Sequence, residues 1–269
     1  MYDFDLQRPK DLDAAIAALA DEGAQPLSGG QTLLPTMKAR LAAPERLVSL
    51  MGIDALRQVR RDGDVVRIGG AATHGRIADA LADLLPGLAD LSARIGDPAV
   101  RTRGTIGGSV ANNDPAACWP AGLLACDATI VTAGPDGTTE HAADAFFKGM
   151  FETALEPGHI VSEVQVPLGQ AVRYEKMIQP ASRFALTAVC VARRDGTVRV
   201  AVTGAGGDGV FRWTAAEDVL TDRFDAAALE DASVPAADAL LSDIHGSGAY
   251  RADLVAVLTR RAVAALAKD

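Results

Sequence analysis

The chain has 269 residues, of which 49% are hydrophobic and 23% are charged, and it carries a net charge of −9 with a pI of about 5.0. This composition is sufficient for one large or two modest hydrophobic cores and argues against disorder. The acidic balance disfavours binding to nucleic acid or to anionic membranes. No apolar run approaches the roughly 18 residues that a membrane span requires.

The cysteines and the start of the chain indicate a cytoplasmic protein. Residues 1–10 contain acidic side chains and lack the apolar stretch of an export signal. Cys118, Cys126 and Cys190 form no CxxC pair, and such an odd, sparse set is typical of reduced cytosolic thiols. Three thiolates are also too few for an all-cysteine iron–sulfur cluster.

The first part of the chain alternates predicted helices and strands. Helical spacing predicts helices over residues 11–23, 32–42, 51–63 and 85–100. Strands are predicted at 26–28 and 46–50, and residues 64–81 read as a strand, a turn and a helix. This alternation is typical of an α/β domain.

The pattern changes near residue 128 to antiparallel β-structure. A hairpin is predicted around Pro135-Asp136-Gly137, followed by a strand over 159–167. Residues 172–206 are predicted to form an antiparallel sheet that turns at Asp195-Gly196, and helical segments follow Gly209. We therefore place a domain boundary near 167–172.

The stretch Leu27-Ser28-Gly29-Gly30-Gln31 matches the signature pentapeptide of ABC-type ATPases. Such a domain also needs a Walker A loop, GxxxxGK followed by Ser or Thr, to hold the phosphates. No Gly-Lys pair occurs anywhere in the chain. The pentapeptide alone therefore carries little weight for that function.

A second stretch, Thr105-Ile106-Gly107-Gly108-Ser109, has a similar make-up. Glycine lets the backbone approach a ligand closely, and successive free N–H groups form an anion site to which hydroxyls add donors. The two loops could therefore cradle the two phosphates of a dinucleotide, although Gly-Gly also occurs in plain tight turns. Neither loop matches GxGxxG, so a Rossmann site is not supported.

Four longer segments, 27–42, 95–117, 146–167 and 174–189, carry a family resemblance in the same order. On them the chain resembles the FAD-binding medium subunit of the molybdenum hydroxylases, the group that contains carbon monoxide dehydrogenase and xanthine dehydrogenase. The resemblance implies an α+β fold of the vanillyl-alcohol-oxidase (PCMH) type. Two α/β subdomains, about 1–52 and 53–167, would hold FAD non-covalently, and a C-terminal domain of antiparallel sheet plus helices would span 172–269.

The resemblance also implies a set of cofactor-binding residues. The two loops would bind the FAD pyrophosphate, Lys176 and Val161 would lie near the flavin, and Phe184 would pack beside the isoalloxazine. The implied set is Leu27, Ser28, Gly29, Gly30, Gln31, Thr32, Leu33, Thr105, Ile106, Gly107, Gly108, Ser109, Asn113, Cys118, Val161, Lys176 and Phe184. No catalytic acid–base residue and no metal ligand is expected.

Several of these residues have a structural alternative. Lys176 could be a solvated strand lysine, Phe184 a core residue, and Asn113 a turn residue that satisfies backbone groups. His74 is expected to be structural, because no metal-ligand spacing accompanies it. Cys118 stands where the family usually has an Asp that bonds the ribose side, so FAD is expected to be held more loosely unless Asp114 or a main-chain group compensates.

The resemblance implies one subunit of a three-component enzyme. A large subunit would hold the molybdopterin cofactor, a small subunit would hold two [2Fe–2S] clusters, and this chain would relay electrons from them to an external acceptor, in a complex dimerised as a whole. Two alternatives stay open. One is a stand-alone FAD oxidoreductase of the same fold, and the other is a binding or assembly protein without flavin.

Overall fold

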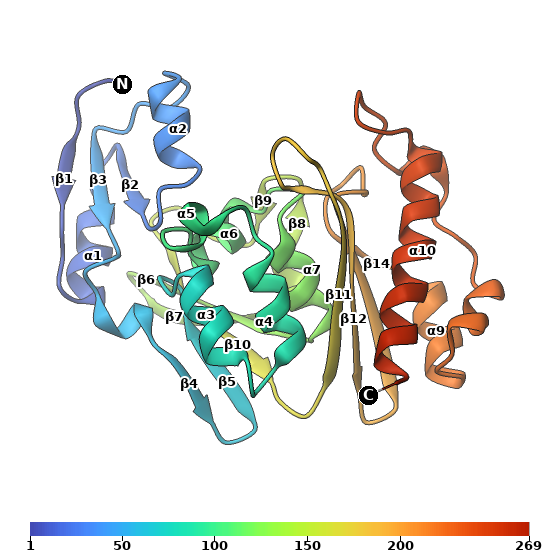
Figure 1. Cartoon of the computed structure of the whole chain (residues 1–269). Coiled ribbons are helices and arrows are strands. Elements are labelled where there is room, and N and C mark those ends of the chain that lie inside the picture. The colour runs from blue at the N-terminus through green and yellow to red at the C-terminus, as the bar shows by residue number, and fades with distance from the viewer. Residues whose placement is uncertain (269) are drawn as a thin grey trace.

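The computed structural model describes residues 1–268 and shows three main sheets that follow one another along the molecule (Figure 1). The N-terminal sheet, the central sheet with its helices, and the C-terminal sheet with its helices lie in chain order from one end to the other. The fold is α+β, with two α/β subdomains and a C-terminal part of antiparallel sheet plus helices, as predicted.

The N-terminal sheet is parallel and three-stranded. Its order is β1 (Asp5–Gln7), β3 (Arg46–Ser49) and β2 (Ala24–Leu27). Helix α1 (Leu12–Leu19) begins at Asp11, whose side chain accepts a hydrogen bond from the N–H of Ala14. The apolar side of α1 packs on β2 and β3, and α2 (Leu33–Lys38) follows the first glycine loop.

The central sheet is antiparallel and five-stranded. Its order is β4 (Val59–Asp62), β5 (Val65–Gly69), β10 (Ile160–Pro167), β6 (Thr129–Gly134) and β7 (Gly137–Ala142). Its helices are α3 (His74–Leu81), α4 (Pro86–Ala93), α5 (Pro98–Arg101), α6 (Ile106–Asn112) and α7 (Cys118–Ala125). Short elements complete this part, namely η1 (Asp54–Arg57), α8 (Ala143–Phe146), β8 (Phe147–Gly149) and β9 (Glu152–Thr153).

The C-terminal sheet is antiparallel and lies between two layers of helices. Its order is β11 (Ala171–Ile178), β12 (Ala185–Arg194), β13 (Thr197–Thr203) and β14 (Phe211–Arg212). Helices α9 (Thr214–Asp222) and α10 (Gly248–Leu266) cover its outer side, while α4 and α7 pack on the strands from the central part (Figure 1). The helical turns η2 (Ala226–Glu230) and η3 (Ala237–Ala239) precede α10.

The largest core joins the central and C-terminal parts. It includes Ile68 and Val164 of the central sheet, Trp119 of α7, and Tyr174 and Cys190 of the C-terminal sheet, all fully buried. Separate clusters lie under α1 and under α9 and α10. This shared core fixes the C-terminal sheet against the helices that carry the second glycine motif.

Most predicted elements are confirmed, but two helices differ. The predicted helix over 51–63 is wrong, because it consists of η1 and of β4, which pairs with β5 through the hairpin at Gly63. The predicted helix over 85–100 divides into α4 and α5, because Gly96 takes a positive φ of 51° and Asp97 caps the new helix at Pro98.

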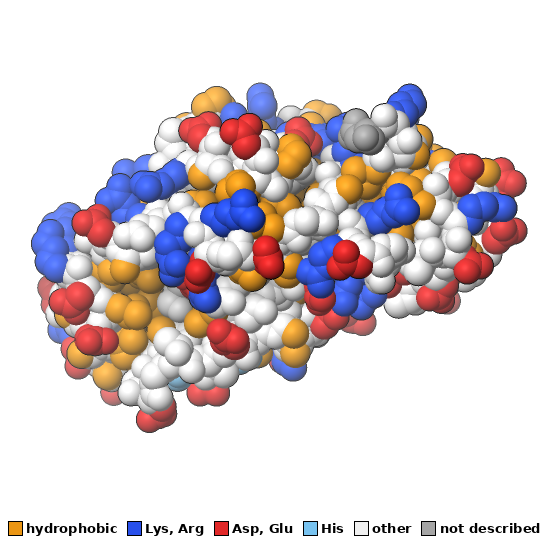
Figure 2. All heavy atoms as spheres, turned by 90° about the horizontal axis from the view of Figure 1, so that it is seen from below, with side chains coloured by type: hydrophobic (Ala, Val, Ile, Leu, Met, Phe, Trp, Pro, Cys, Tyr) orange, Lys and Arg blue, Asp and Glu red, His pale blue; other side chains and the backbone are white. Residues whose placement is uncertain are grey.

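No helix within residues 1–268 is long and apolar enough to cross a membrane. On the face seen from below, basic and acidic side chains are interspersed (Figure 2). The charges on this face therefore form a mixed surface.

Candidate functional site

The first glycine loop connects β2 to α2. Gly30 has a φ of +70°, which an L side chain rarely adopts. Gly29 packs so closely on the second loop that a Cβ would collide with the carbonyl group of Arg103. Among the described residues, the backbone N–H groups of Gly30, Gln31 and Thr32 have no acceptor in the protein. The loop therefore presents free donors.

The second glycine motif opens a helix and is not a free loop. The Thr105 side chain accepts a hydrogen bond from the N–H of Gly108 at 3.2 Å and so caps α6. Gly107 lies against the backbone of Gly70, where a Cβ would be 2.5 Å from the carbonyl oxygen. Gly108 is exposed on the first turn of α6.

The two motifs meet through their hydroxyl groups. Ser28 Oγ and Thr105 Oγ1 are 2.8 Å apart and form a hydrogen bond between residues far apart in the sequence. They stand at the wall of a cavity of about 710 Å³. This volume lies within the usual range for small-molecule and cofactor sites, about 300–1,000 Å³.

The cavity brings together most of the residues predicted from the sequence. Those that line it are Leu27, Ser28, Gly29, Gly30, Gln31, Thr32, Leu33, Thr105, Gly107, Gly108, Ser109, Cys118, Val161, Lys176 and Phe184. They come from all three main sheets or from the segments beside them. The cavity is therefore built between the N-terminal, central and C-terminal parts of the chain.

Ile106 and Asn113 do not line the cavity. The Ile106 side chain is fully buried in the main core. Asn113 ends α6 in the left-handed region, with a φ of 42°, and its amide nitrogen donates to the carbonyl groups of Gly149 and Glu152 at 2.7 and 2.9 Å. Both residues hold α6 in place from behind.

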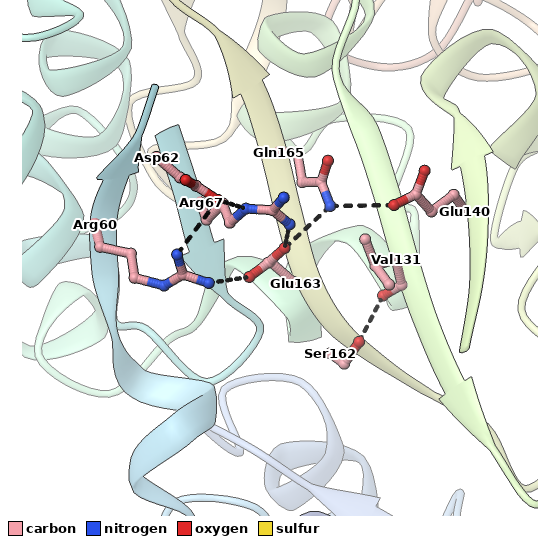
Figure 3. Close-up of polar contacts among 8 residues, drawn as sticks. All are labelled: Arg60, Asp62, Arg67, Val131, Glu140, Ser162, Glu163 and Gln165. Atoms are coloured by element: carbon pink, nitrogen blue, oxygen red, sulfur yellow. Dashed lines mark hydrogen bonds and ion pairs between the residues drawn. The ribbon is translucent and has the colours of Figure 1, made fainter. Parts of the chain in front are cut away.

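Val161 reaches the cavity wall at a β-bulge in β10. The register of β10 against β6 shifts between Val161 and Glu163, and Ser162 Oγ donates to the carbonyl of Val131 at 3.1 Å. Figure 3 shows this bond and, next to it, the Glu163 carboxylate between Arg60 and Arg67. The ion pairs anchor the strand beside the bulge.

Two side chains of the C-terminal sheet region reach the same cavity. Lys176 of β11 is only 7% exposed, and its Nζ donates to the carbonyl of Arg94 at 3.2 Å and to Cys118 Sγ at 3.4 Å. Phe184, just before β12, is 47% exposed at the cavity. Lys176 is therefore a buried lysine, and Phe184 is outside the core.

His74 lies behind the second motif and also lines the cavity. Its Nδ1 accepts a hydrogen bond from Trp119 Nε1 at 3.1 Å, and its backbone N–H donates to the carbonyl of Gly104 at 2.9 Å. Burial, together with the nearby positive charge of Arg101, lowers the pKa of His74 to about 4. The imidazole is therefore neutral at pH 7.

Other lining residues were outside the predicted set. They include Ile95, Gly96, Val100, Asp114, His159 and Arg183. All six lie in segments that carry the family resemblance, namely 95–117, 146–167 and 174–189, so a signal for them was present there. The Asp114 side chain accepts from the N–H of Ala116 at 2.8 Å and so caps a local turn.

The residues present fit a dinucleotide. Free N–H groups and hydroxyls at the joined loops suit a pyrophosphate, which carries negative charge and accepts hydrogen bonds. The exposed Gly108 leaves room for a ligand to approach the backbone. Apolar side chains at Val161 and Phe184 suit an aromatic ring, and Lys176 adds a positive charge. Among residues 1–268, no three His, Cys, Asp or Glu side chains gather as a metal site requires.

Comparison with known proteins assigns the family. Residues 2–169 match the family described as the FAD binding domain in molybdopterin dehydrogenase. The chain is 35% identical to the carbon monoxide dehydrogenase medium chain of Afipia carboxidovorans, over 97% of this chain and 95% of that one. It is 36% identical to the nicotine 6-hydroxylase medium subunit of Paenarthrobacter nicotinovorans, over 93% and 92% of the two chains.

Solved structures agree with this assignment. Reconstituted carbon monoxide dehydrogenase from Oligotropha carboxidovorans superposes with a TM-score of 0.90 at 35% identity, covering 97% of this chain and 96% of that one. Quinoline 2-oxidoreductase from Pseudomonas putida 86 gives a TM-score of 0.89 at 28% identity, covering 99% and 98%. The matches thus extend over the whole length, including the C-terminal sheet and its helices. The chain belongs to the FAD-binding medium subunits of the molybdenum hydroxylase family.

Proposed function

We propose that this chain relays electrons within a three-component molybdenum hydroxylase. Substrate is oxidised at a molybdopterin centre in a large partner subunit, and electrons reach this chain from two [2Fe–2S] clusters in a small partner subunit. FAD supplies the ability to accept single electrons and to release them to an external acceptor. The residues of this chain bind that cofactor, orient it and set its electrostatic surroundings.

The observation that carries the proposal is the hydrogen bond between Ser28 and Thr105 at one cavity wall. It brings the free N–H groups of the first loop next to the first turn of α6. In our proposal these groups donate to the FAD pyrophosphate from two sides, as charge-assisted hydrogen bonds. Gly108 has no side chain that would block this approach.

The remaining residues of the predicted set take two kinds of role. Val161, Phe184 and Lys176 flank the flavin ring, and Cys118 lies beside Lys176. Ile106 and Asn113 act indirectly, because their contacts hold α6 and thus Gly108 in position. No side chain needs to transfer a proton to substrate, because substrate binds in another subunit.

We also propose the domain division 1–167, with subdomains about 1–52 and 53–167, and 172–269. The link between β10 and β11 supports it, because Gly169 has a φ of +76° and no heavy atom near the position of a Cβ. The hydrophobic cluster under α9 and α10 supports the C-terminal unit further, because its members all lie between Leu186 and Leu266. A protease site inserted at Gly169 is expected to be cut in the native protein.

The test is purification of the native complex through a tag on this chain. We expect an iron–sulfur subunit and a molybdopterin subunit to co-purify, with iron, molybdenum and FAD present, and the whole to be dimeric by mass. The isolated chain is expected not to oxidise purines, aldehydes or carbon monoxide. Turnover by the chain alone would favour a stand-alone FAD oxidoreductase, and a complex without flavin would favour an assembly protein.

A further inference from the structure

The ammonium group of Lys176 is buried without a carboxylate partner. Its side chain contacts the carbonyl of Arg94 and the sulfur of Cys118, both neutral acceptors. Within residues 1–268, no Asp or Glu oxygen lies within 4.0 Å of Lys176 Nζ. A buried charge without a counter-charge is costly, so this position favours an anionic partner from the cavity.

The charged and titratable neighbours of Lys176 do not supply that partner. Arg94 is paired with Asp90 at 3.3 Å, and its guanidinium stands over the Tyr174 ring. Burial, together with the neighbouring Cys118, raises the pKa of Tyr174 well above its usual range, so this phenol is neutral. Asp114 lines the same cavity, but its carboxylate caps the turn at Ala116.

The residue at position 118 decides whether the charge of Lys176 has a partner within the protein. A carboxylate at this position would lie beside Lys176 and neutralise it. A thiol is a weak hydrogen-bond acceptor. The contact at 3.4 Å therefore orients the ammonium group while leaving its positive charge uncompensated.

We propose that Lys176 raises the midpoint potential of the bound flavin, and that Cys118 is the positioning residue that leaves the lysine charge unneutralised. This inference rests on the proposed function. Oxidised isoalloxazine is neutral, whereas the reduced ring gains negative charge at N1, so a positive charge facing the ring binds the reduced form more tightly. The cavity thus favours reduced flavin over oxidised flavin.

The test compares midpoint potentials of the holo-protein with those of four variants, by equilibration with a reference dye. In Lys176→Met and Cys118→Asp, we expect the preference for reduced flavin to fall about tenfold, which is about 30 mV for a two-electron couple. Lys176→Arg and Cys118→Asn should stay near the wild-type potential, because the first keeps the charge and the second is a neutral isostere of Asp. Sulfite adds to the flavin ring and leaves it negatively charged. It should therefore bind about tenfold more weakly to Lys176→Met and Cys118→Asp than to the wild type.

The outcomes separate this inference from the proposed function. Unchanged potentials in Lys176→Met and Cys118→Asp, at normal FAD content, would overturn the inference and leave the FAD subunit assignment intact. A weaker affinity of Lys176→Met for oxidised FAD at an unchanged potential would mean that Lys176 pairs with the pyrophosphate, which also overturns it. If the wild-type chain takes up no FAD, both fail. Circular dichroism checks that each variant is folded. Lys176→Met, which keeps an unbranched side chain one atom shorter than that of lysine, carries the test if Cys118→Asp does not fold.

Discussion

The two glycine motifs look alike in the sequence, but in the structure their glycines are required for different physical reasons. Gly29 is required because a Cβ would collide with the carbonyl of Arg103, and Gly30 because its φ is +70°. Both residues of the first loop are therefore explained by the protein alone. A glycine pair in a loop can thus be required by packing and backbone conformation alone, without any contact to a ligand.

In the second motif, the fold requires only the first of the two glycines. Gly107 packs against the backbone of Gly70 and is again required by the fold. At Gly108, by contrast, a Cβ would meet Thr105 Oγ1 at 3.1 Å and Ser28 Cβ at 3.9 Å, and no other heavy atom outside its chain neighbours and its own helix backbone is within 4 Å. Gly108 is thus the one glycine of the two pairs that has neither a positive φ nor a close contact with the backbone of another segment.

The largest expected effect comes from Gly108→Val. The added side chain would project toward the cavity, where we place the pyrophosphate, so FAD affinity should fall by more than tenfold, or about 1.4 kcal/mol. Fluorescence titration of the apo-protein with FAD measures this. The matched control is Gly75→Val, on the first turn of α3, where the nearest heavy atom to a Cβ is 3.5 Å away and the cavity is not reached. Equal affinity in Gly108→Val and wild type would remove the second motif from the phosphate site.

The second-largest effect is a pH dependence of the unfolding free energy, which we attribute to His74 behind the second motif. Because the pKa of His74 is about 4 in the folded protein and 6.5 for an unperturbed histidine side chain, folding is stabilised above pH 6.5, and that stabilisation is lost as the pH falls toward 4. The loss should be roughly 2–4 kcal/mol in unfolding free energy. Urea unfolding of wild type and His74→Gln between pH 4 and 7 measures it, since Gln keeps an acceptor for Trp119. Equal slopes for the two proteins would contradict the assignment to His74.

The third prediction concerns Gly29→Ala and Gly108→Ala in the protein without FAD. The first substitution places a methyl group against the Arg103 carbonyl and should lower the unfolding free energy by about 1–3 kcal/mol. The second adds a methyl group that meets the Thr105 side chain but no backbone of another segment, and it should change the unfolding free energy by less than about 1 kcal/mol. Urea unfolding of both variants makes the comparison. Equal destabilisation would show that the two motifs do not differ as described.

The smallest effect concerns the bond that joins the motifs. A double-mutant cycle of Ser28→Ala and Thr105→Ala should give a coupling of about 0.5–1.5 kcal/mol in unfolding free energy. Thr105→Ala alone should cost more than Ser28→Ala, because Thr105 also caps α6. Additive effects of the two substitutions would indicate that the hydroxyl pair contributes no coupling.

The sequence predicted the cavity residues better than it predicted their local structure. Hydroxyl and glycine patterns identified both motifs because backbone approach and free donors depend on residue type. Helix α6 was not predicted, since Gly107 and Gly108 have low helix propensity, and the Thr105 cap with the packing on β10 overrides it. The predicted helix over 51–63 was wrong because the pairing of β4 with β5 decides its second half.

Other features depend on contacts between distant segments. Nothing in the local sequence indicates that Asn113 donates to the carbonyls of Gly149 and Glu152. The contact between Cys118 and Lys176 likewise joins α7 to β11 across the main core. The bulge at Val161 appears only when β10 is placed against β6. Such pairings are set by tertiary packing, which a pattern along one chain does not contain.

The central claim is that this chain holds FAD non-covalently in the cavity between the two glycine motifs and Lys176. The most direct measurement is acid denaturation of the purified complex, followed by chromatographic identification of the released flavin. The account predicts about one FAD per chain and no FMN, and loss of that FAD in the Gly108→Val variant with the protein still folded. A wild-type complex that contains no flavin and takes up none when FAD is added would contradict it.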